Sequence, residues 1–92
     1  MIRSFRDRET ESLFDRYTSK RWSLIARSAL RKLRVLHRAK DLDDLRVPPG
    51  NRLELLRGDR AGQHSIRVND QYRICFQWDR GDAFEVELTD YH

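Results

Sequence analysis

Residues 64–88 read HSIRVNDQYRICFQWDRGDAFEVEL, and apolar and polar side chains alternate along three runs of this stretch. Alternation with a period of two is typical of β-strands that bury one face. Turn residues interrupt the pattern at Asn69-Asp70 and again at residues 79–82, which predicts two hairpins. The stretch therefore predicts three consecutive antiparallel strands that pack one face on a core.

The phase of the alternation assigns each side chain to one face of the predicted sheet. The core face is expected to carry Ile66, Val68, Ile74, Phe76, Trp78, Phe84, Val86 and Leu88. The opposite face is expected to carry Arg67, Arg73, Glu85, Glu87 and Tyr91. Side chains that are far apart in the sequence would then meet on an open sheet surface. Leu53 and Leu55 mark a further strand before this stretch, and residues 58–62 form a predicted loop.

The strongest helical signal lies at residues 21–39. One apolar stripe at helical spacing contains Trp22, Ile25, Ala26, Ala29, Leu30, Leu33 and Leu36. Arg27, Arg31, Arg34 and Arg38 share the opposite face. This arginine row is either a solvated face or a contact for RNA or for an acidic protein segment.

Shorter elements surround this helix. Residues 2–5 are expected to form a short strand, and Asp7 or Thr10 to cap a helix that runs to about Tyr17, with Leu13, Phe14 and Tyr17 on one side. Residues 41–46 allow one helical turn with Leu42 and Leu45 turned inward, and Pro48-Pro49-Gly50-Asn51 ends any helix. A helical first half and a stranded second half predict an α+β fold, and we expect a single domain over residues 1–92.

Charge is distributed unevenly along the 92 residues. The formal net charge is +4, which favours polyanionic partners, although a basic surface alone would also account for it. Residues 20–40 hold eight basic residues and no acidic one, whereas residues 47–92 hold six basic and eight acidic residues. The arginines of the second half therefore lie among acids and have to be judged one at a time.

The single cysteine, Cys75, excludes an internal disulfide and a cysteine-based zinc cluster. No metal or other cofactor is expected. No apolar run approaches the roughly 20 residues that span a bilayer, and the first residues lack the apolar core of a signal peptide. We therefore expect a cytoplasmic protein without a membrane contact.

Some of these residue types suit metal-free cleavage of RNA. That reaction needs a base for the 2′-OH, a positive charge at the phosphate and an acid for the leaving 5′-oxygen. Arg73 is the first candidate for the phosphate, and Arg57, Arg60 and Arg67 are candidate RNA-binding cations.

The acid and base candidates are at the end of the sequence. His92 can titrate near neutral pH, Asp90 can assist it, and Tyr91 can stack on a base. Asp90 is in phase with the core, but the strand is expected to end there and expose it.

Each candidate has a structural alternative. His92 can simply be solvated, and Arg67 and Arg73 can pair with Glu85 and Glu87 across strands. His64 is in phase with the core, which favours a packed imidazole over a general base. Glu54 is a plausible base only if it faces the same cleft as Arg73.

The same residues resemble a known family. Residues 52–76, the closing Asp90-Tyr91-His92, the opening residues 1–5 and the Pro48-Pro49-Gly50-Asn51 entry to the sheet resemble the HigB toxins. These toxins are the killer-protein branch of the RelE/ParE superfamily. The resemblance implies two N-terminal helices packed on a small, mainly antiparallel sheet.

The resemblance also implies a function. Such a chain would be the toxin of a type II toxin–antitoxin system, an mRNA interferase that enters the ribosomal A site and cuts mRNA during translation. Its partner would be a HigA-type helix-turn-helix antitoxin, which represses the shared operon, so that operator DNA is contacted only through the antitoxin. Arg73 would contact the scissile phosphate, Asp90, Tyr91 and His92 would form the acid/base end of the site, and Arg57 would bind phosphate. Glu54 stands where some members have a histidine, which leaves the general base open, with Glu54 and His64 as possible bases beside the acid/base end.

Two other function classes remain open on the sequence. One is a non-enzymatic toxin of the ParE type, which binds gyrase and needs no titratable terminus. The other is a passive RNA- or DNA-binding module, in which arginines hold the backbone and His92 has no role.

Overall fold

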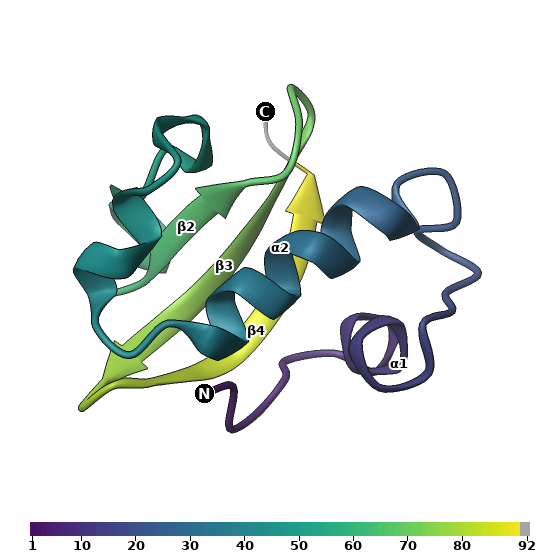
Figure 1. Cartoon of the computed structure of the whole chain (residues 1–92), viewed down its shortest axis with the longest axis horizontal. Helices are drawn as coiled ribbons and strands as arrows, with labels where there is room; N and C mark the ends of the chain where they lie inside the picture. Colours follow the sequence, from purple (N-terminus) through teal and green to yellow (C-terminus); the bar gives the residue numbers. More distant parts are fainter. Residues whose placement is uncertain (91–92) are drawn as a thin grey trace.

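The computed structural model describes residues 1–90 and places two α-helices against a four-stranded antiparallel sheet (Figure 1). The elements follow in the order α1 (Arg8–Arg16), α2 (Ala26–Arg38), η1 (Leu42–Arg46), η2 (Pro49–Asn51), β1 (Glu54–Leu55), η3 (Gly58–Arg60), β2 (His64–Arg67), β3 (Tyr72–Asp79) and β4 (Asp82–Asp90), where η denotes a short 3₁₀ helix. This arrangement confirms the predicted α+β fold. Among these residues, no helix is long and apolar enough to cross a bilayer.

The sheet has the strand order β1-β2-β3-β4, and every neighbouring pair is antiparallel. The side chain of Asn69 holds the first predicted hairpin turn, because its Oδ1 accepts the backbone N–H groups of Gln71 and Tyr72, each at 2.8 Å. The second turn places Arg80 and Gly81 at φ values of 51° and 86°, the left-handed geometry that suits a two-residue hairpin loop. Both predicted hairpins are confirmed.

A β-bulge changes the predicted faces of β4. Gln77 of β3 lies opposite Phe84 and Trp78 lies opposite Ala83, whereas the register is shifted between Cys75 and Gln77. Glu85 supplies the extra residue, with a left-handed φ of 53°. Ala83 is consequently buried, and Phe84 shares the outer face with the exposed Gln77. The prediction that Phe84 lies in the core is therefore wrong, because a period-two pattern cannot show an inserted residue.

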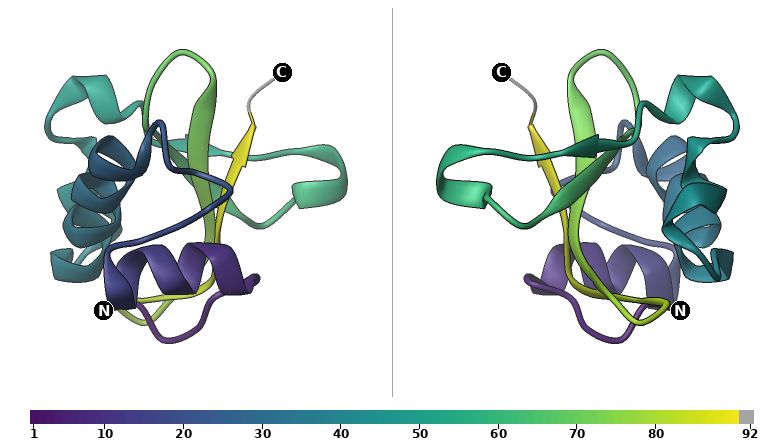
Figure 2. Two further views of the ribbon diagram at one scale, coloured as in Figure 1. Left: turned by 90° about the vertical axis from the view of Figure 1, so that its right-hand side faces the viewer. Right: turned by 90° about the vertical axis from the view of Figure 1, so that its left-hand side faces the viewer.

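Helix α2 covers one face of the sheet (Figures 1 and 2). Its fully buried Ala29, Leu33 and Leu36 join the core row of Ile66 and Ile74. Burial of each leucine or isoleucine side chain contributes about 1.5–3 kcal/mol. The arginines at positions 27, 31, 34 and 38 are all exposed, as the helical spacing predicts.

The helix begins later than predicted, at Ala26 instead of about Arg21. The preceding residues form a turn, in which Ser19 Oγ accepts the Trp22 backbone N–H at 3.1 Å. The Trp22 ring still packs in the core, edge-on against Tyr72 at 5.3 Å between centroids. A side-chain hydroxyl that competes for backbone N–H groups favours a turn over a helix at this point.

Helix α1 begins where the sequence predicts, with Asp7 as its N-cap. Leu13 is fully buried and Phe14 half-buried, but Tyr17 is 65% exposed. Tyr17 is the C-cap residue and has a left-handed φ of 60°, so its side chain does not lie on the apolar side predicted for it.

The predicted turn at residues 41–46 is present as η1, with Leu45 buried and Leu42 half-buried.

The first six residues run beside β4 and cover its edge. The backbone N–H groups of Arg3 and Arg6 donate to Ala83 and Val86 at 2.8 and 2.9 Å. The predicted first strand is thus present as two isolated parallel bridges, Ile2 with Ala83 and Phe5 with Val86. Covering the edge of β4 removes a row of open hydrogen-bonding groups.

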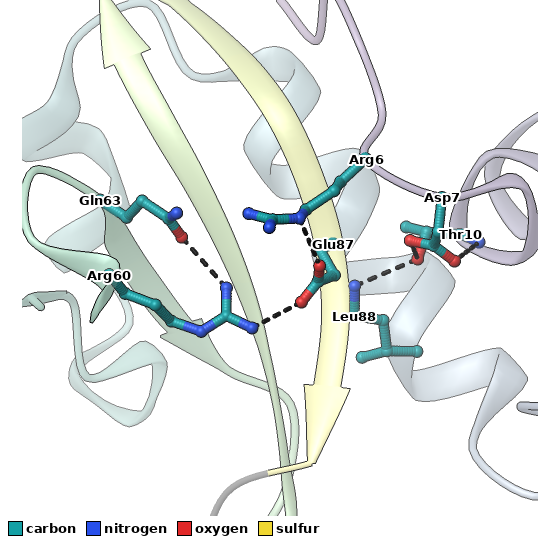
Figure 3. A network of polar contacts seen from close by, with 7 residues as sticks. All are labelled: Arg6, Asp7, Thr10, Arg60, Gln63, Glu87 and Leu88. Carbon is teal, nitrogen blue, oxygen red and sulfur yellow. Dashed lines mark hydrogen bonds and ion pairs between the residues drawn. The ribbon is translucent and has the colours of Figure 1, made fainter. Parts of the chain in front are cut away.

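The buried Thr10 continues this cover from α1. Its hydroxyl accepts the backbone N–H of Leu88 at 3.1 Å and donates to Asp7 Oδ1 at 2.7 Å. The Thr10 backbone N–H also donates to Asp7 Oδ2 at 2.9 Å, which completes the cap (Figure 3). One hydroxyl therefore joins the start of α1 to the last strand of the sheet.

We expect Thr10→Val to lower the free energy of unfolding by about 1–3 kcal/mol, because the buried Leu88 N–H loses its acceptor. Thr10→Ser should retain most of the stability, since it keeps the hydroxyl. Urea unfolding followed by circular dichroism measures both. Thr18→Val at an exposed position is the control and should change stability by about 0.5 kcal/mol or less. Equal losses at positions 10 and 18 would contradict this role of Thr10.

Candidate functional site

The face of the sheet that turns away from α2 carries a row of polar side chains. The register places Arg67 opposite Arg73 and Arg73 opposite Thr89. The next row joins Glu54, Ser65, Cys75 and Glu87 across all four strands. Directly opposed residues in an antiparallel sheet share a face. The expectation that Arg67 and Arg73 meet on this outer face is confirmed.

Two hollows adjoin on this face and together form what we call the sheet groove. The first encloses about 110 Å³ and is lined by Arg52, Glu54, Ser65, Arg67, Asn69, Asp70, Tyr72 and Arg73. The second measures about 310 Å³ and is lined by Glu54, Leu55, Leu56, Arg57, Arg60 and Arg73. Glu54 and Arg73 belong to both. The groove therefore brings five arginines around one central glutamate.

The segment between β1 and β2, which carries η3, supplies one wall of the groove. It projects from the sheet on the side away from α2 (Figure 2). Gly58 and Gly62 bound η3 with φ values of 68° and 90°, a region that other residues rarely enter. This geometry brings Arg57 and Arg60 over the same face as Arg73.

Arg60 is held by a carboxylate of the protein. Its Nη2 donates to Glu87 Oε1 at 2.7 Å, and its Nη1 donates to Gln63 Oε1 at 3.2 Å (Figure 3). Arg6 Nε lies 3.2 Å from the other oxygen of Glu87. The hydrogen bond with Glu87 raises the pKa of Arg60, so this side chain stays charged. Arg60 thus ties the groove wall to β4, and much of its charge is already neutralised.

Arg67 also has a carboxylate partner, but not the one considered from the sequence. It pairs with Asp70 of the β2–β3 turn, and Asp70 itself is fully exposed. Glu87, one of the two cross-strand partners considered, instead binds Arg60 and Arg6. The Arg67–Asp70 pair is exposed to solvent, so a phosphate can compete for Arg67 at little cost.

Two other side chains of the sheet are poorly placed for chemistry in the groove. His64 lies in the core phase, where its ring stacks on Phe76 at 6.1 Å between centroids. Burial, and next the nearby Arg46, lower the pKa of His64 below its ordinary value of 6.5, so the imidazole is neutral at pH 7. Cys75 is fully buried on the groove side of the sheet, and burial raises the pKa of its thiol. The structure therefore brings Glu54 to Arg73, but not His64.

Asp90 is the last described residue of β4, and it is exposed. The expected end of the strand at this residue stays a prediction. Asp90 is paired opposite Tyr72, and Gln71 Nε2 donates to Asp90 Oδ2 at 3.4 Å. Asp90 follows Thr89, which lies directly opposite Arg73. The end of β4 is thus at the Arg73 end of the groove. Tyr91 and His92, the other two predicted residues of the acid/base end, lie outside the described residues.

The sequence reasoning did not single out Arg52 or Ser65 as groove residues. Arg52 ends η2 in a left-handed conformation, with φ at 45°, and lines the first hollow. Ser65 lies between Glu54 and Cys75 in the outer row. The alternation that directs Arg67 outward also directs Ser65 outward, so the sequence pattern is sufficient to predict the position of Ser65 on this face. Within residues 1–90, no three His, Cys, Asp or Glu side chains gather closely enough to hold a metal ion.

We expect the stability of the protein to fall on acidification partly through His64. The pKa of His64 is lower in the folded state than in the unfolded chain. Below about pH 6.5 the unfolded chain therefore binds more protons, and the free energy of unfolding decreases. Between about pH 7 and pH 5, the free energy of unfolding should fall less steeply in His64→Gln than in the wild type. Urea unfolding at several pH values measures this difference. Parallel pH profiles would show that His64 titrates alike in both states.

Comparison with known proteins gives consistent matches. A family model described as the RelE-like toxin of the type II toxin–antitoxin system HigB matches residues 3–92. The chain is 44% identical over 92 residues to "Toxin HigB-1" of Vibrio cholerae, an alignment that covers 96% of this chain and 95% of that protein. It is 46% identical over 41 residues to "Endoribonuclease HigB" of Proteus vulgaris, which covers 45% of each chain. An uncharacterized protein of Haemophilus influenzae is 38% identical over 58 residues, or 63% of this chain and 57% of that protein.

Proposed function

The chain belongs to the HigB family of RelE-like toxins of type II toxin–antitoxin systems, and from this premise we propose that it is an endoribonuclease that cuts mRNA in the ribosomal A site during translation. The observation that carries the proposal is the sheet groove, in which five arginines surround Glu54 on an open face. The name of the Proteus vulgaris relative, an endoribonuclease, supports the same activity. Action on translated mRNA places the protein in the cytoplasm.

Arg73 is the proposed contact for the scissile phosphate. It lines both hollows of the groove and lies in the row with Arg67 and Thr89. A guanidinium donates two parallel hydrogen bonds to phosphate oxygens, and its charge counters the negative charge that builds up in the transition state. Arg57 and Arg67, on either side of Arg73, are the proposed contacts for neighbouring phosphates, with Arg60 as a weaker one.

Proton transfer is assigned to Glu54 and to the residues at the end of β4. Glu54, in the centre and exposed, is the proposed base that takes the proton of the 2′-OH. Asp90, Tyr91 and His92 are the proposed acid/base end, which protonates the leaving 5′-oxygen or takes the base role in place of Glu54. Together with Arg73, these groups supply each element of the reaction, so the proposed cleavage is independent of a metal ion.

An antitoxin partner follows from membership in a toxin–antitoxin family. We propose that this antitoxin is of the HigA type, with a helix-turn-helix that binds operator DNA, and that the toxin meets this DNA only through it. The proposed contacts of the toxin itself are the ribosome and its mRNA.

We expect this protein to produce cuts at codon-related positions in translated mRNA, seen by primer extension in a purified translation system. His92→Ala should abolish the cuts or slow them strongly, because it removes the proposed acid. Cuts that persist in His92→Ala but disappear in Glu54→Gln would move the acid/base role to Glu54. Inhibition of growth without cuts would favour a ParE-like toxin that acts on gyrase. Ribosome binding without cuts would favour a passive RNA-binding module.

We expect Arg73→Ala to slow cleavage by about a hundred-fold or more, the usual cost of losing one donor to transition-state charge. The same change should weaken ribosome association only a few-fold, because Arg73 is one cation among several. Single-turnover cleavage and cosedimentation with ribosomes measure the two effects. Arg80→Ala in the exposed β3–β4 turn is the control and should change neither. Equal losses in cleavage and association would make Arg73 a binding residue only.

A further inference from the structure

We propose that the arginine-lined outer face of α2 is the docking surface for an acidic, amphipathic segment of the antitoxin. Two adjoining hollows form this surface, which we call the helix groove. The first measures about 430 Å³ and is lined by Arg27, Leu30, Arg31, Arg34, Val35 and Arg38. The second, of about 360 Å³, is lined by Phe14, Asp15, Tyr17, Arg34, His37 and Arg38. The inference rests on the toxin–antitoxin family, which implies an antitoxin, and not on ribonuclease activity.

Among the residues that the structure describes, the arginines of the helix groove lack the carboxylate partners that several other arginines have. Elsewhere, Arg3, Arg6, Arg46, Arg60 and Arg67 each have a carboxylate within ion-pair distance. In the part of the chain that the structure describes, the ion pairs include none for the four arginines of α2. Arg34 instead lies over the Tyr17 ring at 5.0 Å. Of the described residues that line the helix groove, Asp15 is the one acid.

This unneutralised row works against the helix that carries it. Arg27 and Arg31, and likewise Arg34 and Arg38, are four residues apart on α2. Like charges at this spacing destabilise a helix. The neighbouring Lys32 does not share this exposure, because it donates to Asn51 Oδ1 on another side of α2. An anionic partner that binds the row would offset the repulsion that the fold leaves in place.

The apolar side chains of the groove distinguish a protein partner from RNA. Leu30 and Val35 are half-buried and line the first hollow on opposite flanks of the arginine row, since residues five positions apart do not share a helix face. Phe14 and Tyr17 extend the apolar surface towards α1. A phosphate backbone would contact the guanidinium groups and leave these apolar side chains uncovered. An acidic amphipathic segment uses both, since its apolar side chains cover the apolar flanks while its carboxylates meet the arginines.

The length of α2 fits such a partner. Thirteen residues of helix extend about 20 Å. That is enough for about four turns of a docked helix or about six residues of an extended segment. Helix α2, which carries the row, lies on the side of the sheet opposite the projecting η3 segment (Figure 2). Docking there uses none of the side chains of the sheet groove.

The charge test compares two double variants of equal net charge. Arg27→Gln/Arg31→Gln removes two guanidiniums from the helix groove, and Arg8→Gln/Arg80→Gln removes two exposed ones outside it. The probe is the antitoxin encoded in the same operon, titrated against each purified toxin by interferometry. We expect about ten-fold weaker binding for the first variant, mainly through slower association and with a shallower dependence on salt. The second variant should remain within about two-fold of the wild type.

The apolar flank at Val35 is tested by Val35→Thr, which keeps the shape of the side chain and replaces one methyl group with a hydroxyl. An amphipathic protein segment should then dissociate several-fold faster, because a polar group replaces an apolar contact. Ribosome cosedimentation of the same variants separates RNA binding from antitoxin binding. Thermal unfolding checks the fold, and the double variant in α2 should melt at or above the wild-type temperature, since repulsion is relieved.

Antitoxin binding as tight for Arg27→Gln/Arg31→Gln as for the control would overturn the proposal. If ribosome binding alone fell, the helix groove would be an RNA contact. If neither fell, it would be a solvated face. Weaker antitoxin binding in the double variant with unchanged binding in Val35→Thr would also contradict an amphipathic partner. None of these measurements depends on RNA cleavage, so a failure of the proposed ribonuclease activity would leave their outcome unaffected.

Discussion

The antiparallel pairing of β3 with β4 determines on which face the candidate site residues of these two strands lie. Ile74 and Leu88 are opposite one another and are buried under α2, so their neighbours Arg73 and Thr89 must point outward. A slip of one residue would bury the arginine and expose the isoleucine, at the cost of an unpaired buried charge. Packing on one face of the sheet thus determines which side chains are presented on the other face.

Much of this arrangement could be predicted from the sequence, because period-two alternation reports burial directly. The predicted turns and the outward direction of Arg67 and Arg73 follow from it. The bulge at Glu85 could not be predicted, since an inserted residue changes the phase without changing composition. The late start of α2 was missed because Trp22 is buried in either conformation, and burial alone does not distinguish a turn from a helix.

The sequence predicts most of the arginines that line the candidate site, but not which side chains they bind within the protein. Arg60 and Arg67 look alike in the sequence, yet Arg60 is held between Glu87 and Gln63 while Arg67 pairs with an exposed aspartate of its own turn. Which carboxylate reaches which arginine depends on how the η3 segment folds over the sheet, a contact across 27 residues. Local patterns carry no information on such long-range pairs.

The ion pairs of Glu87 hold the segment that carries η3 in place over the sheet. A wall built on two glycines in the left-handed region has little stiffness of its own. Arg60 binds it to β4 through Glu87, and Arg6 binds the same carboxylate from the segment that precedes α1 (Figure 3). Groups that act on a transition state are effective when they are held in place before the substrate arrives, because no reorganisation is then needed. The partly buried Glu87 therefore contributes to the sheet groove without facing a phosphate, since it sets where the segment that carries Arg57 can lie.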